Sequence, residues 1–151
     1  MSLEKQINED IKSAMIARDA RKLEALRAIK SSLLIIKTGK DIGGGEIPET
    51  IEISLLQRLV KQRKESAAIY QEKDRQDMAE VEIYQAEIIE QYLPEQMSAE
   101  DVEKVVLEAI EKLSASSIKD MGKVMGLVSK ELAGKADNKT IASFVKKNLQ
   151  A

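Results

Sequence analysis

The stretch "YLPEQMSAED", residues 92–101, decides how the chain is organised. Pro94 ends the preceding helix, because the residue before a proline avoids the helical region of backbone space. "SAED" then forms a capping box, in which the Ser98 side chain accepts a hydrogen bond from the Asp101 amide and starts a new helix. We therefore predict two domains, one over residues 1–95 and one over residues 96–151.

On both sides of this boundary, hydrophobic residues recur at helical spacing, and no segment alternates as a strand would. The predicted fold class is all-α, with an N-terminal four-helix bundle-like domain followed by a small three-helix C-terminal domain. Met15 and Ile51 are among the residues expected to face the first core. The predicted helix starts are Ser2, Asp19, Pro48 and Asp74 in the first domain and Ser98, Ser116 or Ser117, and Asp137 in the second.

The amino-acid composition excludes several classes of active site. The chain has no cysteine and no histidine, so it lacks a thiol nucleophile, a zinc–thiolate site and the commonest general base. The glycine-rich stretch "TGKDIGGGE", residues 38–46, lacks the spacing of a phosphate-binding P-loop and is read as a loop between helices. We expect no catalytic residue, no metal site and no cofactor.

An acidic segment lies in the middle of the chain. Residues 74–97 carry one cation and seven acids, whereas residues 114–151 carry seven lysines and three acids, net +4. Without histidine partners, the acids of this segment are expected to form a solvated face rather than a metal site. Its glutamates include Glu80, Glu82, Glu87 and Glu90; Glu80 or Glu87 is expected to pair with Arg27, Arg58 or Arg63.

The N-terminal residues "MSLEKQINED" contain no apolar segment of the kind that targets a chain for secretion. The longest unbroken apolar run, Leu33 to Ile36, is far too short to cross a bilayer. The expectation is a cytoplasmic protein without a membrane partner.

The segment "MGKVMGLVSKELAGKAD", residues 121–137, contains three glycines in a predicted helix. At about 100° per residue, Gly122 and Gly126 fall on a stripe of small residues that lies between an apolar face and the cations Lys119, Lys123 and Lys130. Two explanations stay open. Another helix packs closely on the stripe, or a phosphate-bearing ligand approaches the bare backbone beside the lysines.

The turn "GKADNKT" follows this helix. Gly134 permits a left-handed conformation, and Asp137 is expected to cap the last helix. Lys135 and Lys139 flank the turn, which could therefore also hold a phosphate.

Four stretches can be compared with known families: "LEALRAIKSSL" (23–33), "KQRKESAAIY" (61–70), "DRQDMAEVEIYQAEIIEQYLPEQMSAEDV" (74–102) and "KDMGKVMGLVSKELAGKADNKTIASFVKKNL" (119–149). Together they resemble the GatB/YqeY proteins over nearly the whole chain. In this family, an arginine usually follows the turn glycine, where this chain has Lys135, and lysine lacks the bidentate phosphate geometry of arginine.

The resemblance implies that the C-terminal part is similar to the tail domain of the B subunit of glutamine-dependent tRNA amidotransferase, which recognises tRNA. The family label is carbon–nitrogen ligase with glutamine as amido-N-donor. We therefore expect a non-catalytic module that binds tRNA or another structured RNA, and not DNA. The alternatives are a module that docks on an amidotransferase subunit or an aminoacyl-tRNA synthetase, and a genuine ligase subunit. The expected RNA-binding residues are Lys119, Gly122, Lys123, Gly126, Lys130, Gly134, Lys135, Asp137 and Lys139.

Overall fold

The computed structural model describes residues 2–39 and 44–149. This part of the chain forms seven α-helices and a short 3₁₀ helix, without any strand. The predicted all-α fold class is confirmed. The middle of the glycine-rich loop, residues 40–43, lies outside the described residues. No helix in the described ranges is long and apolar enough to span a membrane.

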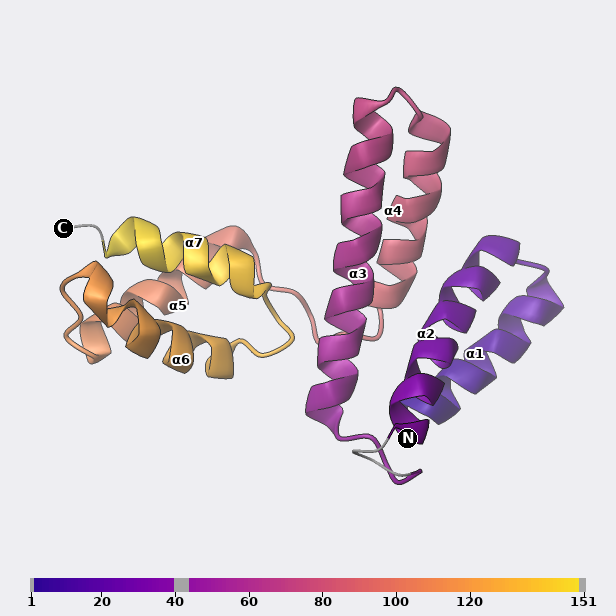
Figure 1. Ribbon diagram of the computed structural model, residues 1–151, viewed down its shortest axis with the longest axis horizontal. Helices are drawn as coiled ribbons and strands as arrows, with labels where there is room; N and C mark the ends of the chain where they lie inside the picture. Colours follow the sequence, from indigo (N-terminus) through magenta and orange to yellow (C-terminus); the bar gives the residue numbers. More distant parts are fainter. Residues whose placement is uncertain (1, 40–43, 150–151) are drawn as a thin grey trace. The chain divides into compact units, whose positions relative to one another are not determined.

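The chain separates into two compact units, Met1–Leu93 and Pro94–Ala151, and each is considered by itself. The N-terminal unit consists of two helical hairpins (Figure 1). Its helices are α1 (Leu3–Ala17), α2 (Ala20–Thr38), α3 (Glu49–Glu72) and α4 (Gln76–Glu90). Helices α1 and α2 form the first hairpin, α3 and α4 form the second, and α2 packs against the second hairpin.

The N-terminal core is built mainly from aliphatic side chains. At its edge, one tyrosine on α4 and one just after it form hydrogen bonds to the first hairpin. The hydroxyl of Tyr84 donates to Asp19 Oδ2 at 3.1 Å, and the hydroxyl of Tyr92 donates to Asp10 Oδ2. These two hydrogen bonds join α4 and the residues just after it to the first hairpin, one at the turn between α1 and α2 and the other on α1. The buried aliphatic residues include Ile7, Leu26, Ile29, Leu33, Leu55, Leu56, Leu59 and Ile89.

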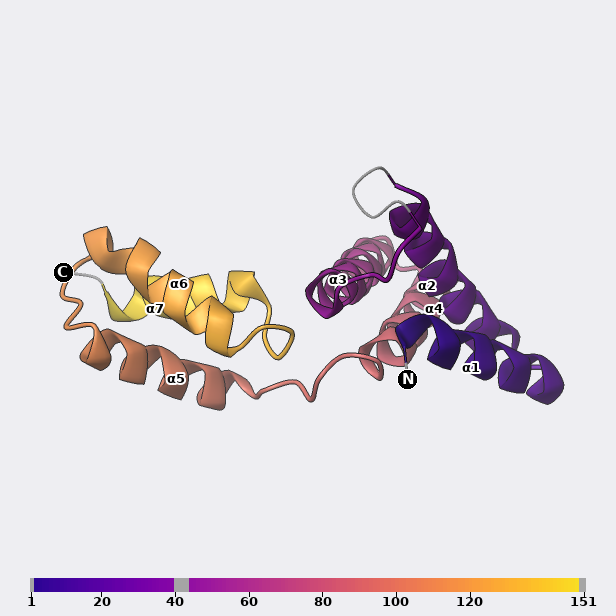
Figure 2. The same cartoon turned by 90° about the horizontal axis from the view of Figure 1, so that it is seen from below.

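The C-terminal unit is a three-helix arrangement with α5 on one side and α6 and α7 on the other (Figure 2). Its elements are α5 (Ala99–Lys112), the 3₁₀ helix η1 (Ile118–Asp120), α6 (Met121–Glu131) and α7 (Asn138–Asn148). Ser98 caps α5 as predicted, since the Asp101 amide donates to its hydroxyl at 3.2 Å. The buried core consists mainly of Val102, Val106, Val124, Val128, Leu132, Ile141, Val145 and Leu149.

Several local predictions were wrong. Met15 is 55% exposed and Ile51 is 37% exposed, because the neighbouring helices cover only part of each predicted apolar face. Asp74 does not cap α4, since its φ of 55° places it in a left-handed turn and the helix starts at Gln76. The helix expected from Ser116 or Ser117 begins as η1 and becomes α-helical at Met121.

Candidate functional site

Helix α6 carries most of the residues singled out in the sequence. Val124 and Val128 are fully buried in the C-terminal core, and the half-buried Met121 and Met125 pack against it. The start of the helix is held by Asp120, which accepts a hydrogen bond from the Ser116 amide at 3.0 Å. One face of α6 is thereby fixed inward and the opposite face is presented to solvent.

Gly122 and Gly126 lie on this outer face. A Cβ atom built on either glycine would have no neighbour within 4 Å outside its own turn of helix. The stripe is therefore open at its two glycines. The other small residues that helical spacing puts on it are Ser129, which is half-buried, and Ala133, which is exposed but lies beyond the end of α6. No helix of this unit packs closely on the two glycines. The first explanation of the stripe therefore does not hold within the unit.

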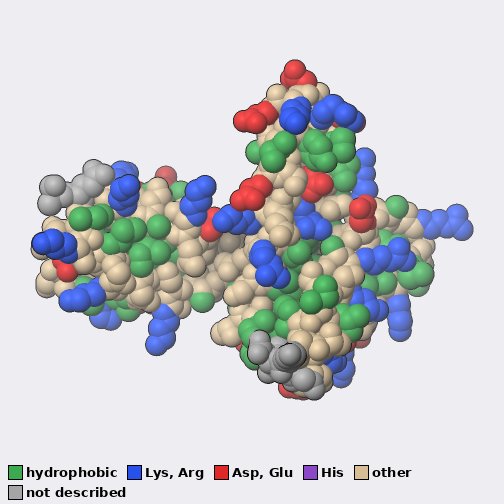
Figure 3. Space-filling model, in the orientation of Figure 1, with side chains coloured by type: hydrophobic (Ala, Val, Ile, Leu, Met, Phe, Trp, Pro, Cys, Tyr) green, Lys and Arg blue, Asp and Glu red, His purple; other side chains and the backbone are tan. Residues whose placement is uncertain are grey.

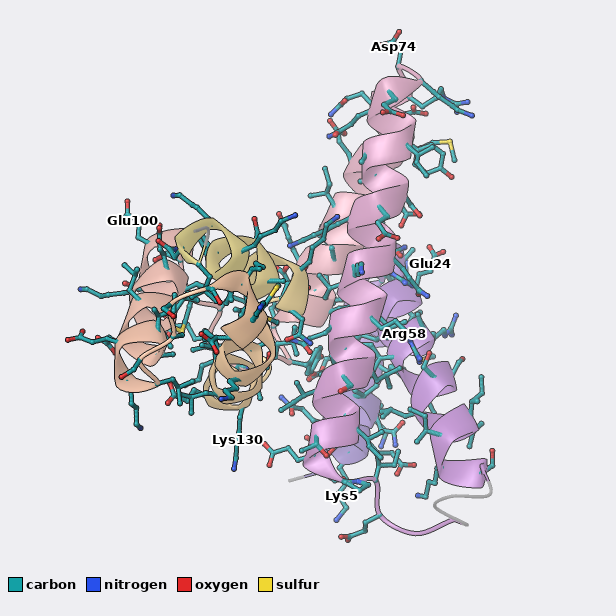
Figure 4. The ribbon with its side chains drawn as sticks, turned by 60° about the vertical axis from the view of Figure 1, so that its left-hand side comes forward. Lys5, Glu24, Arg58, Asp74, Glu100 and Lys130 are labelled. Atoms are coloured by element: carbon teal, nitrogen blue, oxygen red, sulfur yellow. The ribbon has the colours of Figure 1, made fainter. Side chains whose placement is uncertain are left out.

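The lysines beside the stripe are also exposed. Lys123 and Lys130 belong to α6, and the Lys130 side chain extends away from the ribbon (Figure 4). Lys119 lies on η1, one turn earlier, so the α-helical spacing used to place it does not apply. The hydrogen bond from the Ser116 amide lowers the pKa of Asp120, and the charge of Lys123 adds to this effect. Asp120 is thus kept as a carboxylate, which is bonded to the backbone just before η1.

The turn at Gly134 serves a structural purpose. Gly134 is buried, with a φ of 79°, and its carbonyl accepts a hydrogen bond from Gln96 Nε2 at 2.6 Å. The Met97 amide donates to the carbonyl of Lys135 at 2.9 Å. The turn is therefore bonded to the segment that precedes α5. Sequence reasoning missed the part played by Gln96 and Met97, because nothing in a local pattern links residues so far apart in the chain.

Asp137 caps α7 as predicted, accepting a hydrogen bond from the Lys139 amide at 3.1 Å. The side chains of Lys135, Asp137 and Lys139 are all exposed. They lie beyond the end of α6, separated from the glycine pair by the residues of the turn. The structure therefore divides the predicted site residues between η1, the outer face of α6, and the turn and first residues of α7 that follow it.

The glutamates of α4 do not gather into a metal site. Among residues 2–39 and 44–149, no group of three or more acidic residues is placed to hold an ion. Glu90 pairs with Lys64 at 2.7 Å, whereas Glu80 and Glu87 are exposed. The expected pairing of Glu80 or Glu87 with an arginine does not occur among the described residues.

Comparison with known proteins decides the family. The profile of the family described as "Yqey-like protein" matches residues 4–149, which is nearly the whole chain. The chain belongs to the YqeY-like family. The YqeY part of the predicted resemblance is thus confirmed, and the likeness to an amidotransferase tail domain is not.

Three curated relatives of this YqeY-like chain carry the name "Altered inheritance of mitochondria protein 41, mitochondrial". The one from Clavispora lusitaniae is 35% identical over 62% of this chain and 53% of its own length. The one from Meyerozyma guilliermondii is 33% identical over 81% of this chain and 64% of its own length. The one from Pyrenophora tritici-repentis is 26% identical over 96% of this chain and 77% of its own length. The chain thus spans less than two thirds of the first two relatives.

These relatives correct two predictions made for this YqeY-like chain. The predicted cytoplasmic location is wrong, because the relatives are named as mitochondrial proteins. The predicted function as a tRNA-binding module of an amidotransferase is also contradicted, because the relatives are named for the inheritance of mitochondria. The location was predicted from the lack of an apolar N-terminal segment and of a long apolar run. The function was predicted from the resemblance together with the order of apolar, small and cationic residues around the helix predicted within residues 121–137.

Alanine at position 126 is expected to raise the free energy of unfolding of the C-terminal unit by about 1 kcal/mol, because glycine is a poor helix former and the new methyl group meets no other atom. Gly122→Ala is expected to raise the free energy of unfolding by less, since Gly122 lies in the first turn of α6. Urea unfolding of the variants measures both effects. Gly134→Ala is the matched control and is expected to destabilise, since its φ is positive. A lower free energy of unfolding for Gly126→Ala than for the natural chain would contradict the finding that the stripe is open at this glycine.

Proposed function

We propose that the C-terminal unit of this YqeY-like protein is a binding module that docks an acidic helix of a partner protein on the outer face of α6. The observation that carries the proposal is the open space above Gly122 and Gly126. The fold itself has no use for glycine at these positions, and each glycine weakens the helix. A partner that approaches the backbone closely gives both glycines a purpose.

The shape and charge of this face suit such a partner. The distance between packed helices depends on the side chains at the contact, and small residues four positions apart let two helix backbones approach closely. Lys123 and Lys130 stand beside the stripe and would meet carboxylates on the partner. Asp120 and Asp137, two of the three acids in residues 114–151, each accept a hydrogen bond from a backbone amide. The cations therefore dominate the outer face.

One feature favours a protein over a nucleic acid as the ligand. Proteins that hold single strands stack the bases on aromatic side chains, but the only phenylalanine of the chain, Phe144, packs against the C-terminal core.

Photo-crosslinking tests the proposal. A benzophenone amino acid at position 123 is expected to capture a protein from a cell or mitochondrial extract, whereas the same group at Lys104, an exposed position on α5, is expected not to. Mass spectrometry then identifies the partner and the crosslinked peptide, which should be an acidic helix.

Calorimetry with the purified partner measures the contribution of the face. Gly126→Leu and Lys123→Glu are each expected to weaken binding at least tenfold, which is about 1.4 kcal/mol. Lys104→Glu is the control and should bind as the natural chain does. Unchanged affinity of Gly126→Leu, or crosslinks from position 123 to nucleic acid alone, would overturn the proposal.

A further inference from the structure

The chain passes from one unit to the other through a short segment between α4 and α5. Residues 94–98 have no regular secondary structure and run as an open trace in Figure 2. Up to Leu93, the chain belongs to the N-terminal unit, because Tyr92 and Leu93 pack against its core and the Tyr92 hydroxyl is bonded to Asp10. The first residue beyond that unit is Pro94.

The C-terminal unit contacts this segment through Gln96 and Met97. The Met97 amide is bonded to the Lys135 carbonyl, and the Met97 side chain packs against the C-terminal core. The side-chain amide of Gln96 makes two hydrogen bonds, one for each of its two donor hydrogens. Its Nε2 atom lies 2.6 Å from the Gly134 carbonyl oxygen and 2.8 Å from the Pro94 carbonyl oxygen. The C-terminal unit therefore holds the chain from Gln96 onward and, through this side chain, the carbonyl of Pro94 as well.

The hydrogen bond from Gln96 to Pro94 closes a ring that contains Glu95. While this ring is closed, the Pro94 carbonyl is fixed to the turn at Gly134, and neither backbone torsion of Glu95 can rotate freely. The pyrrolidine ring fixes φ of Pro94, and the proline keeps Leu93 before it out of the helical region. The one backbone bond left to rotate is therefore the Cα–C bond of Pro94, which is its ψ torsion.

We propose that the Gln96 side chain is a latch on the joint between the two units. With the latch closed, the units rotate relative to each other only about the Cα–C bond of Pro94. With the latch open, both torsions of Glu95 are also released, and the joint becomes a flexible linker. Gln96 is exposed, so water competes for its amide and the latch can open without a change in either core. Glu95 supplies no replacement contact, since it forms no hydrogen bond or ion pair with the described residues.

NMR relaxation of the backbone amides in the full chain tests the latch. In the natural chain, the amide of Glu95 is expected to be as rigid as those of α5, with an order parameter of about 0.85. In Gln96→Glu, the order parameter of Glu95 is expected to fall below about 0.6, because a carboxylate has the same reach as the amide but no donor. The amide of Met97, which is bonded to Lys135, should stay rigid in both chains.

Gln91→Glu is the matched control for this experiment. Gln91 is also exposed and lies just before the joint, and its side chain has no hydrogen bond in the part of the chain that the structure describes. The same replacement there should leave the order parameter of Glu95 unchanged. A mobile Glu95 in the natural chain, or a rigid Glu95 in Gln96→Glu, would overturn the proposal.

Distances between two spin labels measure the joint itself. The chain has no cysteine, and lysine and arginine side chains project from the surface of both units in Figure 3. The labels are therefore attached through Arg58→Cys on α3 and Lys104→Cys on α5, both at exposed positions. Gln96→Glu is expected to broaden the distribution of label-to-label distances, whereas Gln91→Glu is not. Equal distributions in all three chains would show that Gln96 does not restrict the joint.

Discussion

Replacing Ile141 with alanine is expected to unfold the C-terminal unit while the N-terminal unit keeps its helices. Ile141 is fully buried between α7 and the rest of its core. Truncating a buried isoleucine to alanine costs about 2–5 kcal/mol. A unit of this size is expected to have only about 3–9 kcal/mol of stability in total. One substitution therefore removes much or all of its stability.

Hydrogen exchange followed by mass spectrometry measures this effect in each unit separately. Peptides from α5, α6 and α7 should lose protection in Ile141→Ala, and peptides from α1 to α4 should not. Leu107→Ala, at an exposed leucine of α5, serves as the control and should leave both units protected. Equal loss of protection in both units would contradict the prediction that the chain has two independent domains.

Tyr92→Phe is expected to lower the free energy of unfolding of the N-terminal unit by about 1.5–3 kcal/mol, the range for a hydrogen bond to a charged group. The Tyr92 hydroxyl donates to the partly buried Asp10 carboxylate, which would be left without this partner. Urea unfolding gives the difference. Tyr70→Phe is the control, because no hydrogen bond to the Tyr70 hydroxyl occurs in the described part of the chain, and it should change stability little.

The same tyrosine makes a pH-dependent contribution. Burial, together with the hydrogen bond to Asp10, raises the pKa of Tyr92 well above its ordinary value of 10.0. Folding therefore favours the neutral phenol. This stabilisation is complete below pH 10 and is lost as the pH rises from there towards the folded-state pKa. The stability difference between the natural chain and Tyr92→Phe should accordingly shrink above pH 10, and a difference that grows with pH would contradict this account.

The sequence predicted the parts of the fold that depend on local chemistry. Ser98 and Asp137 cap helices as expected, because a cap is decided by the side chain and by amides two or three residues away. Periodicity correctly gave the glycine-bearing helix an apolar face, which lies in the core with Val124 and Val128 fully buried. It failed for Met15, because periodicity describes one helix and cannot show how far a neighbour extends along it.

The candidate site was harder to predict for a related reason. A helical wheel places Gly122 and Gly126 on one stripe, but it does not say whether another helix already covers that stripe. The structure supplies this missing fact, since nothing lies above either glycine. The exposure of Ile69, in the last turn of α3, depends on where the first hairpin ends, and no local pattern in the sequence marks that boundary.

The bonds from Gln96 and Met97 to the turn at Gly134 and Lys135 determine where the chain can be cut. Ser98 marks the first cap of α5, and it would be the natural place to begin a fragment that contains the C-terminal unit alone. Such a fragment would leave the carbonyls of Gly134 and Lys135 without their partners. A fragment that begins at Pro94 retains both hydrogen bonds. This is the fragment of the C-terminal unit that should be made for binding measurements.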